Sequence, residues 1–227
     1  MINTLINGEW NIILPEHRSL RPEWKLENGG WERKRLDSMY KNIGKGDTLF
    51  YVGAEEGDMP ALCQMWGAEI VMFEPNPKVW SNIKAIWEAN DLETPYTFVG
   101  FASNETNYGN VIKGFPECAD GEVISDHGFM ELHNHNANEI KIDDISDLIP
   151  TALSIDVEGS EWEVLKGAEQ TLRKHKPKIW LSAHPEFQWR MYGCYTYDMR
   201  NWIKDIGYIE TLLDYNHEVH LYYESQK

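Results

Sequence analysis

The segment Leu153-Ser-Ile-Asp-Val-Glu-Gly-Ser-Glu-Trp-Glu-Val-Leu-Lys-Gly-Ala168 decides the fold of this chain. It predicts an apolar strand that ends in two carboxylates, Asp156 and Glu158, followed by a turn at Gly159 and an amphipathic helix. An open α/β sheet presents side chains in this way at the carboxyl ends of its strands, where ligands bind. We therefore expect an acidic site at that edge of a sheet.

An earlier segment has a related pattern and predicts a nucleoside site. Asp47-Thr-Leu-Phe-Tyr-Val-Gly-Ala-Glu-Glu-Gly57 reads as a strand and a turn that Gly53 and Gly57 bracket. Glu74 ends the next predicted strand, 21 residues after Gly53. A carboxylate at that distance can accept hydrogen bonds from both hydroxyls of a ribose. The alternative is that the two glycines serve only the turn.

The charges in this turn bear on the choice of cofactor. Glu55 and Glu56 stand where a pyrophosphate would otherwise rest on a helix N-terminus. Negative side chains there oppose a dinucleotide and tolerate a cofactor that has a positive centre and no phosphate, such as S-adenosylmethionine (SAM). The G-x-x-x-G spacing also departs from the pattern of NAD-binding folds. An NAD-dependent oxidoreductase is therefore disfavoured.

Predicted strands and helices alternate along the chain, which favours a doubly wound α/β sheet. The sheet is expected to be mostly parallel and to close with an antiparallel pair formed by residues 208–213 and 219–223. Residues 1–30 are predicted to form an irregular arm or lid, and residues 31–227 one domain. The polar, glycine-rich stretch 106–138 reads as a hairpin and loop excursion. The other predicted strands are 48–52, 69–73, 96–101, 153–157 and 178–181.

The composition restricts the partners and the compartment. The chain has 227 residues and a formal net charge of -16. This charge repels phosphates and anionic lipid, so we expect neither nucleic acid nor a membrane as partner. No apolar run reaches transmembrane length, and the first residues lack the basic and apolar regions of a signal peptide. Three widely spaced cysteines favour a reducing compartment, so the expected location is the cytoplasm.

Three segments together resemble the FkbM-type family of SAM-dependent methyltransferases. They are 46–57, which resembles the family's first glycine motif, 73–77, which resembles its ribose motif, and 154–168, where the match is close. The resemblance implies a class I, Rossmann-like methyltransferase fold and O-methylation, commonly of a sugar hydroxyl. It also implies a set of cofactor-binding residues: Gly53, Ala54, Glu55, Gly57, Glu74, Pro75, Phe101, Ala102, Ser103 and Asp156.

The chain departs from the family pattern at two positions that bear on the site. The family usually has an acid two residues before the first motif glycine, and this chain has Tyr51 there. After the fifth strand the family commonly reads acid-x-His-Pro, whereas this chain has Ser182-Ala-His-Pro185. These differences keep open a non-catalytic module of methyltransferase fold that binds a nucleoside or a glycan.

The catalytic prediction follows from what methyl transfer needs. The acceptor hydroxyl must be placed against the methyl group and must lose its proton. Asp156 and His184 are predicted to act as the acid–base and positioning pair, and Glu158 to orient the acceptor or to bind a metal. Asp156, Glu158 and His184 also suit Mg²⁺ or Mn²⁺, although nothing in their spacing requires an ion. The alternative is that the two carboxylates merely cap the following turn.

Two further groups are weaker candidates. The run from Asp126 to His135 holds three histidines, but its spacing suits a solvated loop better than a metal site. An aromatic group follows the fifth strand and is suited to stacking on a sugar, although packing is the commoner explanation. That group is Trp189, Tyr192, Tyr195 and Tyr197.

The sequence thus predicts a SAM-dependent O-methyltransferase that acts on a hydroxyl of a sugar or glycan. The alternatives are a methyltransferase for a small non-carbohydrate metabolite and the non-catalytic binding module. The acceptor is expected to be selected by the arm 1–30 and the loop 106–138, for which no motif was recognised.

Overall fold

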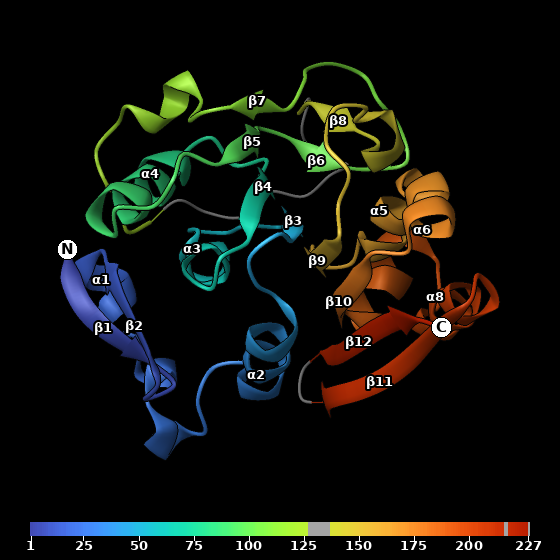
Figure 1. The fold of residues 1–227 in the computed structure, drawn as a ribbon, viewed down its shortest axis with the longest axis horizontal. Helices are drawn as coiled ribbons and strands as arrows, with labels where there is room; N and C mark the ends of the chain where they lie inside the picture. Colours follow the sequence, from blue (N-terminus) through green and yellow to red (C-terminus); the bar gives the residue numbers. More distant parts are fainter. Residues whose placement is uncertain (127–136, 216–217, 227) are drawn as a thin grey trace.

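Short runs of apolar residues form a central sheet that is buried on both faces. The computed structural model describes residues 1–126, 137–215 and 218–226. In the described part the sheet has eight strands, in the order β11-β12-β10-β9-β3-β4-β5-β7 (Figure 1). Along the chain these are β3 (Thr48–Val52), β4 (Glu69–Phe73), β5 (Tyr96–Phe98), β7 (Ile112–Lys113), β9 (Ala152–Asp156), β10 (Lys178–Ala183), β11 (Tyr208–Tyr215) and β12 (Val219–Ser225).

The five strands from β10 to β5 are parallel, and β11, β12 and β7 are antiparallel to their neighbours. This confirms the predicted, mostly parallel sheet with a C-terminal antiparallel pair. The chain runs from β3 to β4 on one side and later returns to β9 on the other, which makes a topological switch point. Val52 pairs with Phe73 and with Ile155 in register. The turns after β3, β4 and β9 therefore meet at one edge.

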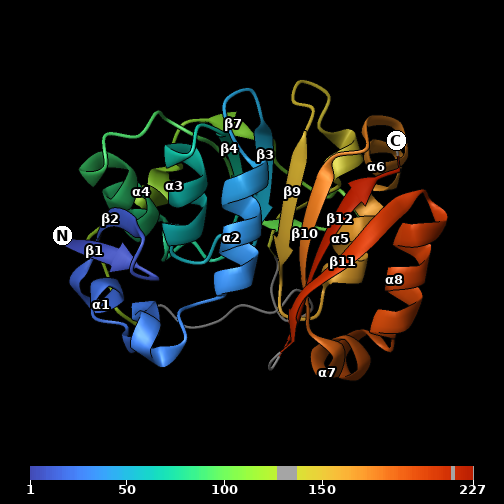
Figure 2. The same ribbon diagram turned by 60° about the horizontal axis from the view of Figure 1, so that its bottom comes forward.

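Two layers of helices cover the sheet (Figure 2). One face carries α2 (Arg33–Asn42), α3 (Asp58–Met65) and α4 (Trp80–Ala89), and the other carries α5 (Glu161–Gly167), α6 (Glu169–His175) and α8 (Thr196–Asp205). Successive strand residues point to opposite faces. In β3, Leu49 and Tyr51 join the first core, whereas Phe50 and Val52 join the second.

The N-terminal arm was predicted to be irregular, and this part of the prediction was wrong. The arm forms a hairpin of β1 (Ile2–Ile6) and β2 (Trp10–Leu14), followed by α1 (Glu16–Ser19). Asn7 and Gly8 at its tip both have positive φ, which a tight hairpin turn requires. Two 3₁₀ turns follow, η1 (Pro22–Trp24) and η2 (Leu26–Asn28). The buried side chains of the arm belong to the same core as α2, α3 and α4.

The region after β5 also differs from the prediction, because the expected strand 96–101 is broken at Gly100. A Cβ at Gly100 would lie 2.4 Å from the carbonyl oxygen of Asn138, so the chain passes too close for a larger residue. A separate two-stranded sheet forms instead from β6 (Phe101–Ala102) and β8 (Glu139–Ile140). The 3₁₀ turn η5 (Ile142–Asp144) comes shortly after β8.

The remaining helical elements are short. They are the 3₁₀ turn η3 (Glu117–Ala119), α7 (Pro185–Phe187) and a π-helical segment, Gln188–Tyr192, directly after it. Within the described ranges, no helix combines the length and the apolar character needed to cross a lipid bilayer.

Candidate functional site

A cavity of about 380 Å³ lies at the edge of the sheet where β3, β4 and β9 end. Its volume is in the range typical of small-molecule sites. Asp156 and Glu158 line the same cavity as the predicted cofactor residues, so the two predicted halves share one space. Of the predicted cofactor residues, those in its wall are Gly53, Ala54, Glu55, Glu74, Pro75, Phe101, Ala102 and Asp156.

The predicted glycines have packing roles in this structure. Gly53 has φ of +85°, and a Cβ on it would lie 1.8 Å from the carbonyl oxygen of Asp156. The missing side chain thus lets the turn after β3 pack on the end of β9, and Gly53 itself lies in the cavity wall. Gly57 and Ser103 lie in the part of the chain that the structure describes, but neither of them lines the cavity. A Cβ on Gly57 would press on Ile83 and Trp87 of α4, which indicates a packing role.

Glu74 is held at the end of β4 by the backbone around it. Its Oε2 accepts the amide hydrogen of Glu55, and its Oε1 accepts that of Asn76, each at 2.9 Å. The side chain is buried but remains in the cavity wall. Each carboxylate oxygen can accept more than one hydrogen bond. Both oxygens of Glu74 are therefore held in fixed positions at the end of β4, where the sequence predicts a ribose carboxylate.

Residues of the N-terminal arm compensate the acidic turn. The buried Arg18 guanidinium donates hydrogen bonds to both oxygens of Glu55, at 2.9 and 3.1 Å, and to Asp58 at 2.9 Å through Nε. Glu56 is buried, and its Oε2 lies 2.6 Å from Nε2 of His17. The carboxylates that were expected to face a positive cofactor are thus largely engaged by the arm. The charge argument against a dinucleotide is weaker than the sequence suggested.

Asp156 is fixed by α2, which covers the face of the sheet to which Ser154 and Asp156 point. The Arg35 guanidinium donates a 2.8 Å hydrogen bond to Oδ2 of Asp156 and another of 2.8 Å to Ser154 Oγ. Arg35 is itself paired with Glu32 one turn earlier. Tyr51, at the position where the family has an acid, lies in the same buried environment. Burial raises the pKa of its phenol well above the ordinary value, so Tyr51 is neutral.

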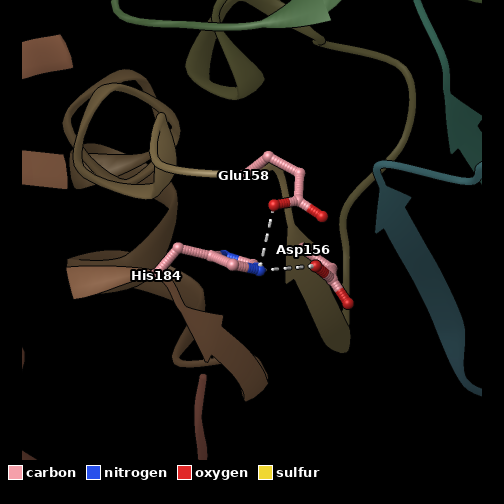
Figure 3. A group of neighbouring side chains, drawn as sticks. All are labelled: Asp156, Glu158 and His184. Carbon is pink, nitrogen blue, oxygen red and sulfur yellow. Dashed lines mark ion pairs between the residues drawn. The ribbon is translucent and has the colours of Figure 1, made fainter. Parts of the chain in front are cut away.

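Four carboxylates lie around His184. Figure 3 shows two of them, Asp156 and Glu158. The Nδ1 atom of His184 donates a 2.6 Å hydrogen bond to Oε1 of Glu161, which is fully buried. Its Nε2 lies 3.1 Å from Oε2 of Glu218 and 3.4 Å from Oε2 of Glu158. The same nitrogen is 3.8 Å from Oδ1 of Asp156. These side chains come from the ends of β9 and β10, the start of α5 and the segment just before β12.

The surroundings of His184 argue against its predicted role as a base. Burial opposes the charge on the imidazole, but hydrogen bonds to Glu161 and Glu218 and the nearby Asp156 outweigh it and raise the pKa of His184 to about 11. The ring therefore carries both protons at neutral pH in the absence of another cation. His184 is also 5% exposed and does not line the cavity. With both ring nitrogens protonated, His184 is suited to positioning the carboxylates.

Glu158 faces the cavity, and its backbone is strained. Its φ is +50°, in the left-handed region that non-glycine residues rarely adopt. Such strain occurs often at functional sites. Burial raises the pKa of Glu158, an effect that the nearby His184 partly offsets. A carboxylate with a raised pKa is a stronger base toward a hydroxyl than an ordinary one.

Several residues of this site were missed by the sequence analysis. Glu32 and Arg35 belong to the segment 31–42, whose sequence predicts an amphipathic helix. Arg35 falls on the apolar face of this helix, one turn before Met39, and a charge at that place is the signal that could have revealed both residues. In the sequence, Glu161 indicates only the start of a helix and Glu218 only part of a hairpin, so neither was recognised as a site residue. No local pattern marks these two, because their partner His184 is distant in sequence.

Of the two weaker candidates, only the aromatic group can be located in the structure. The run 127–135 lies outside the described residues. Trp189 and Tyr195 stack on each other with ring centroids 4.7 Å apart, and both are exposed. None of the four aromatic residues of this segment lines the cavity.

The model of the Methyltransferase FkbM domain matches residues 51–210 of the chain. The chain belongs to the FkbM methyltransferase family. The matched range contains the cofactor turn after β3, Glu74, Asp156, Glu158 and His184. Residues 1–50, which include the arm with Arg18 and Arg21, precede it.

This FkbM-family chain is similar to the hexuronic acid methyltransferase AglP of Haloferax volcanii. The two are 24% identical over 161 residues, which cover 69% of this chain and 64% of AglP. The chain thus spans less than two thirds of the length of that relative.

Solved structures share the fold at low sequence identity. Methyltransferase FkbM from Methylobacillus flagellatus matches with a TM-score of 0.57 and 20% identity, over 80% of this chain and 44% of the other. The precorrin-6y C5,15-methyltransferase of Geobacter metallireducens matches with a TM-score of 0.52 and 14% identity, over 95% and 94% of the two chains. These likenesses establish the class I methyltransferase fold.

Proposed function

We propose that this chain transfers a methyl group from SAM to a hydroxyl oxygen of a sugar or glycan. The observation that carries the proposal is the shared cavity, which has the ribose-type carboxylate Glu74 in one part of its wall and Asp156 and Glu158 in another. Two reactants held in one enclosed space react far faster than two that must meet in solution. The family and the fold support a methyl donor as one of the two reactants.

The residues of the cavity fit SAM. Glu74 offers two oriented carboxylate oxygens to a ribose, and Phe101 and Ala102 provide an apolar wall for an adenine. SAM supplies an electrophilic methyl group on a sulfonium. Carboxylates at and just after the ends of β3 and β9, among them Glu55, Asp156 and Glu158, line the cavity, and a positive centre is favoured beside them.

Two carboxylates are available for the acceptor. In the transfer, the acceptor oxygen would form a bond to the methyl carbon while the bond between that carbon and sulfur breaks. The electron pair of the broken bond would stay on sulfur, which gives S-adenosylhomocysteine (SAH). The hydroxyl proton passes to a carboxylate. We assign this proton to Glu158, because Glu158 faces the cavity and has a raised pKa. Asp156, fixed by Arg35, accepts a hydrogen bond from the acceptor and holds it in line.

A sugar that carries a carboxylate would find a partner on the N-terminal arm. Arg21 lies in the cavity wall with its guanidinium 4.5 Å from the Trp31 ring centroid and 5.1 Å from that of Trp24. Its ion pairs with Glu23 and Glu55, at 3.7 and 3.9 Å, are too long for hydrogen bonds. A guanidinium oriented in this way can bind a carboxylate through two parallel hydrogen bonds. The hexuronic acid in the name of AglP is a sugar of this kind, which supports a sugar acid as acceptor.

The proposal is tested by turnover. The purified chain is incubated with SAM and a panel of neutral hexoses, uronic acids and small non-carbohydrate alcohols, and SAH and methylated products are quantified by mass spectrometry. We expect SAH to form with a sugar acceptor and the product to be a methyl ether. SAH formation with the alcohols alone would favour the small-metabolite alternative. SAM binding without turnover on any acceptor would favour the non-catalytic module.

A further inference from the structure

The side chains around His184 have the arrangement of a divalent-cation site on the wall of the cavity. We propose that Asp156, Glu158, His184 and Glu218 bind one divalent metal ion, with Mn²⁺ or Mg²⁺ as the fitting ions. Binding of the ion does not depend on methyl transfer, whereas its role in catalysis rests on the function proposed above.

The spacing of the four ligand atoms carries this inference. Nitrogen and oxygen ligands lie about 2.0–2.2 Å from such ions, so two neighbouring ligands are about 3 Å apart in an octahedral site and about 3.4 Å in a tetrahedral one. The Nε2 atom of His184 is 3.1 Å from Glu218, 3.4 Å from Glu158 and 3.8 Å from Asp156. Asp156, Glu158 and His184 each place one ligand atom within 4.8 Å of the other two. Small rotations of these three side chains bring their ligand atoms onto one ion. Glu218, whose Oε2 contacts the same His184 nitrogen, stands beside them as the fourth ligand of the proposal.

The orientation of His184 is fixed as it is in metal sites. A metal-binding histidine usually donates its other ring N–H to a carboxylate, which directs the free nitrogen at the ion. Nδ1 of His184 does so to the buried Glu161. Glu161 is in turn held by the amide of Gly159 at 3.0 Å and the side-chain amide of Gln188 at 2.7 Å. The imidazole therefore has a built support that points Nε2 at the three cavity carboxylates.

A second and independent observation lies behind Glu218. His220 is 1% exposed, and its Nε2 has no hydrogen-bond partner among the described residues. That nitrogen lies 3.7 Å from Oε1 of Glu218, while Nδ1 is 2.9 Å from Ser182 Oγ. Buried ring nitrogens are rarely left without a partner. Nε2 of His220 thus faces Glu218 without forming a hydrogen bond to it. A further polar group, such as a bound ion, is expected at this place.

The ligand set indicates both the ion and its use. Three carboxylates and one imidazole suit Mn²⁺ well and Mg²⁺ somewhat less, because imidazole is the softer ligand. Asp156, Glu158 and Glu218 line the cavity, so the remaining coordination positions face the acceptor. Two neighbouring hydroxyls of a sugar can occupy those positions. The ion would then orient the acceptor and lower the pKa of its hydroxyl, while Glu158 would bind through one oxygen and keep the other for the proton.

The experiment measures Mn²⁺ binding directly. The full chain is treated with a chelator, and Mn²⁺ is titrated while the signal of the free ion is followed by electron paramagnetic resonance, in the presence and absence of SAH. We expect one site with micromolar affinity. Glu218→Gln and Glu161→Gln should each weaken binding about 10- to 100-fold. Glu186→Gln is the matched control, because Glu186 is exposed, lies two residues from His184 and has its ion pair with Arg190 on the surface.

The chain is acidic and can hold ions non-specifically, so the variants decide the outcome. Unchanged binding in both Glu218→Gln and Glu161→Gln, or binding no tighter than the weak background expected of any acidic surface, would overturn the proposal. Melting temperatures show whether each variant is folded, and two conservative variants keep the test valid if one is not. SAH binding without Mn²⁺ binding would reject the ion and leave methyl transfer standing. Site-specific Mn²⁺ binding without SAH binding would support the ion and reject methyl transfer.

Discussion

The proposed cofactor part and the proposed acceptor part of the cavity are built in different ways. Gly53 and Glu74, in the cofactor part, lie within a short stretch of chain, and each directly follows a strand. The acceptor part combines Arg35, His184 and Glu218, which are far apart in sequence and surround Asp156. The first kind of site depends on local turns and the second on the packing of the whole sheet. Substitutions in the two parts should therefore affect different measurements.

The largest expected effect is on turnover, from Asp156→Asn in the acceptor part. Asparagine has the size of aspartate and keeps one oxygen that can take the hydrogen bond from Arg35. It interacts more weakly than a carboxylate with the hydroxyl group that is to be methylated. We expect kcat to fall by about 10²- to 10⁴-fold, with SAM affinity nearly unchanged. Steady-state kinetics and calorimetry measure the two quantities. Asp147→Asn, on an exposed loop, should change neither, and retained turnover in Asp156→Asn would remove this residue from the mechanism.

The next effect is on stability, at the junction of the two parts. Gly53→Ala places a Cβ against the carbonyl of Asp156, in a left-handed backbone conformation. We expect a loss of about 1 kcal/mol from the conformation and roughly 1–3 kcal/mol from overpacking. Gly46→Ala has the same sign of φ but no atom within 4 Å of the new Cβ, so it isolates the conformational cost. Equal urea midpoints for the two variants would contradict the close approach.

A smaller effect is expected on cofactor affinity. Glu74→Ala removes the predicted ribose acceptor, and hydrogen bonds to a charged group contribute about 1.5–3 kcal/mol. SAM should therefore bind about 10- to 100-fold more weakly, as measured by calorimetry. Glu69→Ala is the control, because Glu69 begins the same strand at the opposite edge and pairs with Lys113 on the surface. Equal affinities in the two variants would disprove the ribose assignment.

The smallest predicted effect concerns the choice of acceptor. Arg21→Met keeps the apolar stem on the two tryptophans and removes the donors. We expect KM for a uronic acid to rise about fivefold, since a partly exposed charge pair contributes about 1 kcal/mol or less. KM for a neutral hexose should stay the same. Arg33→Met, outside the cavity, serves as the control, and an equal rise for both sugars would point to packing instead of charge.

Much of the fold could be predicted because the signals are local. The strand 48–52, the glycine turn after it and Glu74 were predicted where the structure has them. The hairpin at Asn7-Gly8 was missed, although this dipeptide is a strong turn signal. The break at Gly100 could not be seen, because it depends on the carbonyl of Asn138, which is distant in sequence.

The candidate site was predicted in part for the same reason. Asp156 and Glu158 follow from a strand that ends in acids, but the proton on His184 follows from Glu161 and Glu218, which only the fold brings near. Ser182 replaces the acid of the family pattern, and its hydroxyl contacts His220 instead. A basic imidazole among carboxylates cannot be deduced from the spacing of His184 alone.

The most direct test of the account is calorimetric titration of SAH into the purified chain. The cavity between Glu74 and Asp156 predicts one site per chain with micromolar affinity, and loss of most of that affinity in Glu74→Ala. The absence of binding heat at millimolar SAH, in a chain that melts cooperatively, would contradict the assignment of the cavity to a nucleoside cofactor.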